Sequence, residues 1–183
     1  MQSLERASIL LALTEGLRAN GSWTGETHIQ KASYFLEEFL GVPLGFDFIL
    51  YKHGPYSFDL TSELASMQAN AILSLHSQPA PYGPTYVPGE AGALLKRTHG
   101  DAARRFECEI NFVAQKLGAR SVSELERIAT ALYVTLEKTA AEQRPTRIHE
   151  LKPHVSSADA ERAVDDFERI RAAAVREGLR TVA

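Results

Sequence analysis

The sequence has little cysteine and no long hydrophobic run. Cys108 is the single cysteine among 183 residues, which excludes a disulfide framework and a cysteine-rich zinc site. No segment approaches the roughly 18 consecutive apolar residues of a membrane-spanning helix. The first residues also lack the basic-then-apolar pattern of a secretion signal. We therefore expect a cytoplasmic protein that has no membrane partner.

Catalytic and cofactor signatures are also lacking. Six histidines occur, but none lies four residues from another, and no H-E-x-x-H, G-x-S-x-G, P-loop or G-x-G-x-x-G pattern is present. We predict no catalytic residue, no cofactor and no metal site. Cys108 lies one helical turn from Arg104 and Arg105, which would favour a thiolate if the side chain were exposed. A lone cysteine on a core-forming helix is, however, usually buried and unreactive.

Basic residues are scarce in the first half of the chain. Residues 1–90 contain four basic residues against nine acidic ones, a net charge of −5, whereas the second half carries +2. Affinity for DNA comes largely from phosphate neutralisation by lysine and arginine. The acidic first half therefore disfavours nucleic acid as a partner.

Hydrophobic residues make up 44% and charged residues 23% of the chain, values typical of a globular domain. Apolar residues recur at helical spacing over most of the sequence, with a short alternating segment near residue 50. We predict a mostly α (α+β) fold. A winged-helix-like lobe with a small β-hairpin occupies residues 1–90, and a helical lobe of residues 91–183 packs on it to form one compact unit.

Several boundaries can be predicted in the first lobe. A first helix is expected from Ser3 to Asn20, and a second begins at a capping box formed by Thr27 and Gln30. The alternation from Phe46 to Tyr51 predicts a strand, and Ser57 can cap a third helix. Residues 72–75 and 86–87 are expected to form a hairpin with a stiff tip. Its four prolines are Pro79, Pro81, Pro84 and Pro88.

The second lobe is predicted to be helical throughout. Asp101 is a candidate cap for one helix, and Ser121 with Glu124 forms a capping box for the next. A short turn is expected near Ile148 and Leu151. The last helix is predicted to start at Ser157.

The most informative segment is Tyr51-Lys52-His53-Gly54-Pro55-Tyr56-Ser57, which combines aromatic, titratable and rigid residues where a strand meets a helix. Turn chemistry alone accounts for most of these residue types. The functional interpretation is a fixed recognition surface presented by His53 and Tyr56. Lys31 and Tyr34 of the second helix either complete that surface or only cover the core with their stems. The predicted partner-binding residues are Lys31, Tyr34, Tyr51, Lys52, His53, Gly54, Pro55, Tyr56 and Ser57.

The segment from Thr27 to Leu60, THIQKASYFLEEFLGVPLGFDFILYKHGPYSFDL, carries a resemblance. It is similar to the YwgA-like family of uncharacterised prokaryotic proteins, and more distantly to the Panacea domain of antitoxins and of the SocA proteolytic adaptor. The shared pattern is Q-K-x-x-Y-F-L followed by Y-G-P-Y-S, with His53 in place of the first tyrosine. A weaker similarity runs from Leu151 to Ile170. The resemblance implies a winged-helix-like core and a non-catalytic role in neutralising or delivering another protein.

Three functions from different classes remain open. The first is a non-enzymatic protein-interaction module, an antitoxin- or adaptor-like regulator of a toxin, protease or defence component, in phage defence or a mobile element. The alternative is a winged-helix DNA-binding transcriptional regulator that uses basic clusters of the second lobe. An enzyme with His53 or Tyr56 as acid or base is the third, and it would need a further catalytic group. A homodimer is compatible with any of them.

Overall fold

A computed structural model describes residues 1–79 and 83–182 of the chain. The fold is mostly α-helical, as predicted from the sequence, and has two small antiparallel β-hairpins where one was predicted. The elements of the first half are α1 (Ser3–Ala19), α2 (Glu26–Tyr34), the π-helical turn η1 (Phe35–Phe39), β1 (Ile49–Tyr51), β2 (Gly54–Tyr56), α3 (Phe58–Ala69), β3 (Leu73–His76) and β4 (Thr85–Pro88). The second half comprises α4 (Gly92–Arg105), α5 (Glu107–Leu117), α6 (Val122–Leu136), the 3-10 turn η2 (Ala141–Gln143), α7 (Arg144–Leu151) and α8 (Ser157–Arg176).

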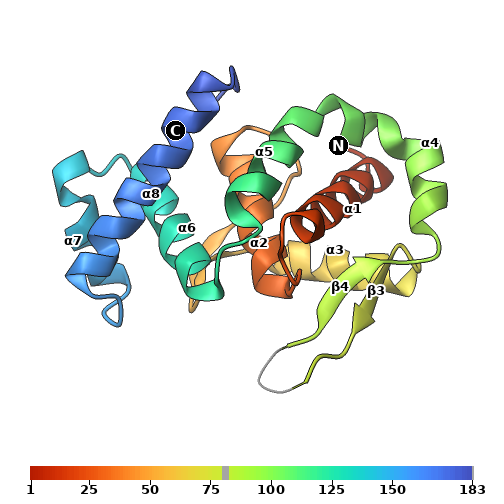
Figure 1. The fold of residues 1–183 in the computed structure, drawn as a ribbon, viewed down its shortest axis with the longest axis horizontal. Coiled ribbons are helices and arrows are strands. Elements are labelled where there is room, and N and C mark those ends of the chain that lie inside the picture. Colours follow the sequence, from red (N-terminus) through yellow and green to blue (C-terminus); the bar gives the residue numbers. More distant parts are fainter. Residues whose placement is uncertain (80–82, 183) are drawn as a thin grey trace.

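One hydrophobic core runs through both halves of the chain. Helix α1 packs against α4 and α5, α2 packs against α6, and α6 packs against α8, so that α2 lies near the middle of the molecule (Figure 1). The ring of Phe167 in α8 lies 6.3 Å from that of Phe35 and 5.6 Å from that of Phe39. These edge-on contacts join η1 to the last helix, and aromatic rings bury much apolar area in such arrangements.

Helix α2 begins differently from the sequence prediction. Its N-cap residue is Gly25, which offers no side-chain cap, and the predicted capping box of Thr27 and Gln30 is wrong. The reason is that Gln30 makes its hydrogen bonds outside α2, to Ser57 and to the hydroxyl of Thr61. The helix then widens into η1 and ends before Gly41, whose φ of +70° suits glycine.

The first hairpin is formed by β1 and β2. The pairs are Ile49 with Tyr56, Leu50 with Pro55, and Tyr51 with Gly54. The predicted strand is real but begins at residue 49 rather than 46. Its partner β2 was predicted only as a turn, because glycine and proline usually interrupt strands. Pro55 is tolerated there because this edge of β2 faces a side chain of α2 instead of another strand.

The second hairpin confirms the predicted pairing of strands near residues 73 and 87. Leu73 pairs with Pro88 and His76 with Thr85. Figure 1 shows β3 and β4 extending away from the helical body. Pro79 and Pro84 follow β3 and precede β4 respectively, while Pro81 lies outside the described residues.

Boundaries in the second half agree only in part with the predictions. Ser121 and Glu124 form the predicted capping box of α6, but Asp101 lies inside α4 instead of capping a helix. The predicted turn near Ile148 is the helix α7. Helix α8 starts at Ser157 as predicted, and its cap is Ser156, whose hydroxyl oxygen accepts from the N–H of Asp159.

Among the described residues, no helix is both long enough and apolar enough to cross a membrane.

Candidate protein-interaction surface

The β1–β2 hairpin is held from below by a buried side chain of α2. Gln30 donates from Nε2 to the carbonyl oxygen of Ser57 at 2.8 Å and accepts at Oε1 from the N–H of Ser57 at 2.9 Å. Both residues are fully buried. An unpaired backbone group would be costly at this depth. The glutamine amide therefore serves Ser57 as a neighbouring strand would.

The next residue of α2 supports the same hairpin. Lys31 is 1% exposed, and its Nζ donates to the carbonyl oxygen of Pro55 at 2.9 Å. Burial lowers the pKa of the Lys31 ammonium group to about 8, with the charge of Lys152 acting in the same direction and that of Glu126 opposing it. The outer edge of β2 is thus closed by a buried cation.

A second buried lysine holds the tip of the hairpin. Lys152, which follows α7 and is 5% exposed, donates from Nζ to the carbonyl oxygens of Tyr51 and of Lys52. Its Nζ also lies 3.6 Å from Oε1 of Glu126. The turn is therefore anchored to the C-terminal helices as well as to α2.

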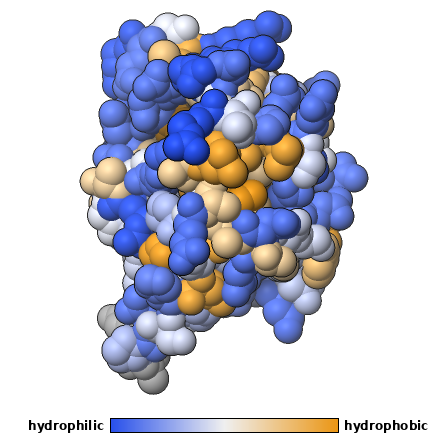
Figure 2. Space-filling view, turned by 90° about the vertical axis from the view of Figure 1, so that its right-hand side faces the viewer, coloured by the Kyte–Doolittle hydropathy of each residue, from blue (hydrophilic) through white to orange (hydrophobic). Residues whose placement is uncertain are grey.

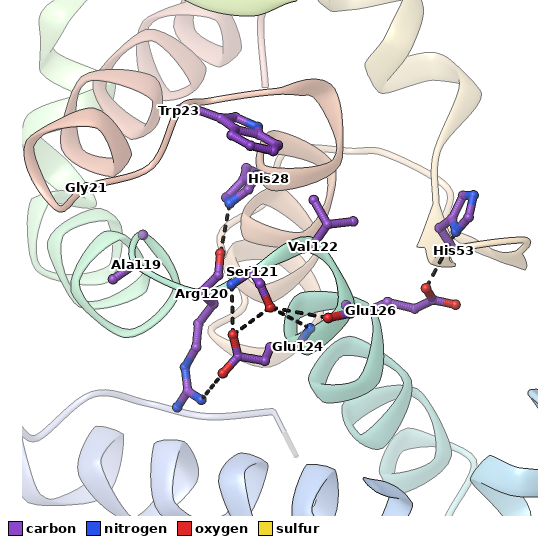
Figure 3. A pocket seen from close by; sticks show the side chains of 12 residues that line it. Gly21, Trp23, His28, His53, Ala119, Arg120, Ser121, Val122, Glu124 and Glu126 are labelled. Atoms are coloured by element: carbon purple, nitrogen blue, oxygen red, sulfur yellow. Dashed lines mark hydrogen bonds and ion pairs between the residues drawn. The ribbon is translucent and has the colours of Figure 1, made fainter. Parts of the chain in front are cut away.

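Glu126 of α6 is the carboxylate that pairs with Lys152. Besides Lys152, it faces His53 at 3.5 Å and His154 at 3.4 Å, and both imidazoles are largely exposed. Figure 3 shows Glu126 pointing toward His53. Its Oε1 has no hydrogen-bond partner among the described residues. The ion pair with Lys152 therefore compensates the buried charge, which would otherwise be strongly unfavourable.

On this support lies an exposed apolar surface, which we call the aromatic face: Ile49, Tyr51, Tyr56 and Phe58. Ile49 is 49%, Tyr51 45% and Phe58 57% exposed. The three rings contact one another, with centroid distances of 5.8 Å for Tyr51–Tyr56, 5.7 Å for Tyr51–Phe58 and 5.1 Å for Tyr56–Phe58. Ile49 stands opposite Tyr56 in the hairpin.

Tyr56 is fixed at its hydroxyl end. The hydroxyl lies 2.9 Å from Oε1 of Glu26, to which it donates, and 2.6 Å from the hydroxyl of Thr61. Thr61 itself donates to the same carboxylate oxygen at 2.8 Å. Burial raises the pKa of Tyr56, and the Glu26 carboxylate adds to this shift while the Thr61 hydrogen bond opposes it. The ring orientation is therefore defined without a partner present.

The structure divides the predicted partner-binding residues into two groups. Tyr51, Lys52 and His53 are exposed and Tyr56 is half-buried, so these four are open to contact. The other five are buried and reach no partner directly in this conformation. They are Lys31, Tyr34, Gly54, Pro55 and Ser57. Of the two readings of Lys31 and Tyr34, the structure favours a supporting role.

Sequence reasoning missed several residues of this site. Phe58 could have been found, because it falls out of phase with the buried positions Leu60, Leu64 and Met67 of α3. Glu126 and Lys152 carry no local signal, because only the folded chain brings them to the hairpin.

Outside this site, Cys108 also differs from expectation, since it is exposed on α5.

A cavity of about 770 Å³ lies beside the hairpin, next to the start of α6 (Figure 3). His28 is 4% exposed, and its Nε2 bonds to the carbonyl oxygen of Arg120 at 3.0 Å. Burial lowers the pKa of His28, and this hydrogen bond opposes the shift only in part. Glu124 binds Ser121 and Arg120. Several polar groups at the mouth of the cavity thus bond to one another, although the buried Nδ1 of His28 has no hydrogen-bond partner among the described residues.

The described residues contain no cluster of three histidine, cysteine or acidic side chains arranged to hold a metal ion. The helix that would read DNA, α3, has no lysine or arginine, and its exposed positions include Asp59. The exposed side of α3, next to the aromatic face, is therefore acidic rather than basic.

A second apolar surface lies between α1 and α4, visible as the hydrophobic patch of Figure 2. It includes a groove of about 300 Å³ with Leu4 and Leu94 at its rim, which are 46% and 53% exposed. This groove is lined by aliphatic side chains together with Asn70, Thr98 and His99, and no buried hydrogen-bond network like that of Gln30 and Lys31 is seen beneath it among the described residues. The aromatic face is therefore the better-defined candidate.

The chain matches no protein-family model, and no curated protein matches it either.

Proposed function

We propose that this chain is a non-enzymatic protein-interaction module, an antitoxin- or adaptor-like regulator that binds another protein through the aromatic face. One observation carries the proposal: three contacting aromatic rings are exposed on a hairpin whose backbone is fixed by buried side chains. The partner class is a toxin, a protease or a defence component.

Exposed aromatic residues support this proposal because they are enriched at protein interfaces and dominate binding energies there. A side chain that is already ordered loses little conformational entropy when a partner binds. Tyr56 has its hydroxyl bonded to Glu26, and the backbone below it is held by Gln30 through Ser57. The face is thus pre-organised for contact.

The resemblance to the Panacea domain gives independent support. The two parts of its pattern, Q-K in α2 and G-P-Y-S in β2 and the start of α3, touch through the Gln30–Ser57 and Lys31–Pro55 hydrogen bonds. Because the two separated parts of the sequence pattern are in contact, they form one structural unit. We infer that this unit serves to present the aromatic face.

The experiment is partner capture from a native lysate with Phe58→Ala and Tyr51→Ala variants. Both side chains are largely exposed, so the fold should survive, as circular dichroism and a thermal melt would verify. Val175→Ala on α8 is the control, because Val175 is 64% exposed and lies outside both apolar surfaces. Tyr56→Ala is less clean, since it also removes the contacts to Glu26 and Thr61.

We expect one protein to be captured in stoichiometric amount, with or without nuclease treatment. Its capture should be lost with Phe58→Ala and with Tyr51→Ala but retained with Val175→Ala. Loss with Leu94→Ala only would move the interaction to the α1–α4 groove. Retention that disappears with nuclease would favour the DNA-binding regulator instead.

A further inference from the structure

We propose that the occupant of the aromatic face is a basic protein segment that places an arginine side chain against Tyr51 and Phe58. This inference rests on the proposed function and deepens it by naming the chemistry of the partner. The distribution of charge around the face supports it.

Acidic side chains border the aromatic face on several sides. Glu26 accepts the Tyr56 hydroxyl directly, and Asp59 follows Phe58 in the first turn of α3. Burial alternates from Phe46 to Tyr51, which places Asp47 on the exposed side with Ile49 and Tyr51. The carboxylates of Asp47 and Asp59 make no hydrogen bond or ion pair within the described part of the chain. The exposed basic side chain nearest in sequence is Lys52.

An arginine satisfies both features of this surface at once. Its planar guanidinium stacks on tyrosine and phenylalanine rings, whose faces attract cations, and its N–H groups pair with carboxylates in a fixed geometry. A purely apolar partner would cover Asp59 without pairing its charge, which is unfavourable. An acidic partner, or the phosphates of a nucleic acid, would be repelled by the same carboxylates.

The two buried lysines under the hairpin do not neutralise the carboxylates around the aromatic face. Lys152 and Lys31 use their ammonium groups on the hairpin carbonyls and lie beneath the surface, at 5% and 1% exposure. Their positive charges therefore sit next to Glu126 rather than beside an incoming cation. The groups that a partner would meet on the aromatic face are therefore the rings and the carboxylates, with exposed Lys52 and His53 at the hairpin tip beside it.

The inference can be tested with a random-peptide display selection. The protein is immobilised through a biotin group on Cys108, which is exposed and is the single cysteine of the chain. Peptides that also bind the Phe58→Ala variant are removed. The remaining sequences are then compared with the unselected library.

We expect enrichment of arginine next to apolar residues. Enrichment of apolar or acidic peptides that depends on Phe58 would overturn the basic occupant but leave a protein-interaction function in place. If no peptide depends on Phe58, both proposals fail at this surface. Binding of a single-stranded oligonucleotide probe in preference to every peptide would replace both with a nucleic-acid function.

The affinity of one selected peptide then tests the role of charge. Replacing its arginine by citrulline should weaken binding, and Asp59→Asn should weaken it by about two- to fivefold, the range of an exposed ion pair. Both losses should shrink at high salt, where exposed charges are screened. Asp101→Asn on α4 is the control, because Asp101 is also exposed but belongs to another surface. Equal affinities for the arginine and citrulline peptides would contradict the proposal.

Discussion

The side-chain amide of Gln30 pairs with both backbone groups of Ser57, one bond in each direction, at 2.8 and 2.9 Å. This geometry reproduces the two hydrogen bonds that a residue of a neighbouring strand would make. It also leaves the Ser57 hydroxyl free to cap α3, where it accepts from the N–H of Leu60 at 3.3 Å. One glutamine thereby couples helix α2 to the start of α3.

Replacing Gln30 should destabilise the protein because it leaves the buried N–H of Ser57 without a partner, whereas the Ser57 carbonyl still accepts from the N–H of Thr61 at 3.3 Å. Gln30→Met keeps a similar volume and removes both bonds to Ser57 and the one to the Thr61 hydroxyl, so we expect a loss of about 1–3 kcal/mol in the free energy of unfolding, the cost of one unpaired buried group. Chemical denaturation measures it. Gln68→Met is the matched control, because Gln68 is exposed on α3 and should change little.

A carboxylate at the same position gives a pH-dependent version of this test. In Gln30→Glu, an ionised side chain can accept from the Ser57 N–H but cannot donate to the Ser57 carbonyl, whereas the protonated acid can do both. The deficit relative to wild type should therefore be largest at neutral pH and shrink as the pH falls. A deficit that is constant with pH would show that the amide is not bonded as described.

Gly54 is required by two separate constraints. Its φ is +82°, and a Cβ atom there would lie 3.2 Å from the carbonyl oxygen of Glu126. Gly21 has a similar φ of +89° with nothing within 4 Å of its Cβ position. We expect Gly21→Ala to cost about 1–2 kcal/mol, the penalty of left-handed backbone, and Gly54→Ala to cost more. Equal costs in thermal or denaturant unfolding would mean that the contact with α6 is loose.

Local pattern was enough to predict much of this fold. Apolar spacing located α1 and α3, and the Ser121–Glu124 capping box located the start of α6, because those signals act between residues close in sequence. The same reasoning failed at Gln30. A glutamine three residues after a threonine satisfies the local pattern of a capping box, and only the packing of the hairpin against α2 gives it a different partner.

The candidate site shows the same division. The segment from Tyr51 to Ser57 could be selected for its residue types, but the sequence does not separate those that face solvent from those that support them. Lys31 illustrates the difficulty, since a lysine is rarely buried unless it is paired. Its partners, the Pro55 carbonyl and the Glu126 charge, lie on β2 and α6. Long-range contacts of this kind leave no periodic signal.

Lys152 is expected to keep the hairpin tip closed. Lys152→Met retains the aliphatic stem but removes the bonds to the Tyr51 and Lys52 carbonyls and the ion pair with Glu126. We expect faster amide hydrogen exchange at residues 51–54, since local opening of the tip becomes easier. Exchange near Leu10 in α1 should change only by the loss of global stability. An unchanged rate at the tip would show that the hairpin is held without Lys152.

Lys31 should make the stability of the protein depend on pH in the alkaline range. Its folded-state pKa of about 8, lowered chiefly by burial, lies below the ordinary value of a lysine. Between about pH 8 and pH 10.4 the unfolded chain therefore holds a proton at this side chain that the folded chain has released. Stability rises with pH wherever the unfolded state binds more protons. The contribution of Lys31 thus becomes more favourable as the pH rises through this window.

Comparing wild type with Lys31→Met isolates this contribution from the other groups that titrate there. Lys152, whose pKa is also lowered by burial, and Tyr56, whose pKa is raised, are present in both proteins. We expect the difference in the free energy of unfolding, wild type minus variant, to increase by about 1–3 kcal/mol between pH 7 and pH 10, since one pKa unit corresponds to about 1.4 kcal/mol. Denaturant titrations at several pH values measure the difference. A difference that stays constant across the window would show that the Lys31 ammonium is not desolvated beneath the hairpin, and the buried support of the aromatic face would then need another explanation.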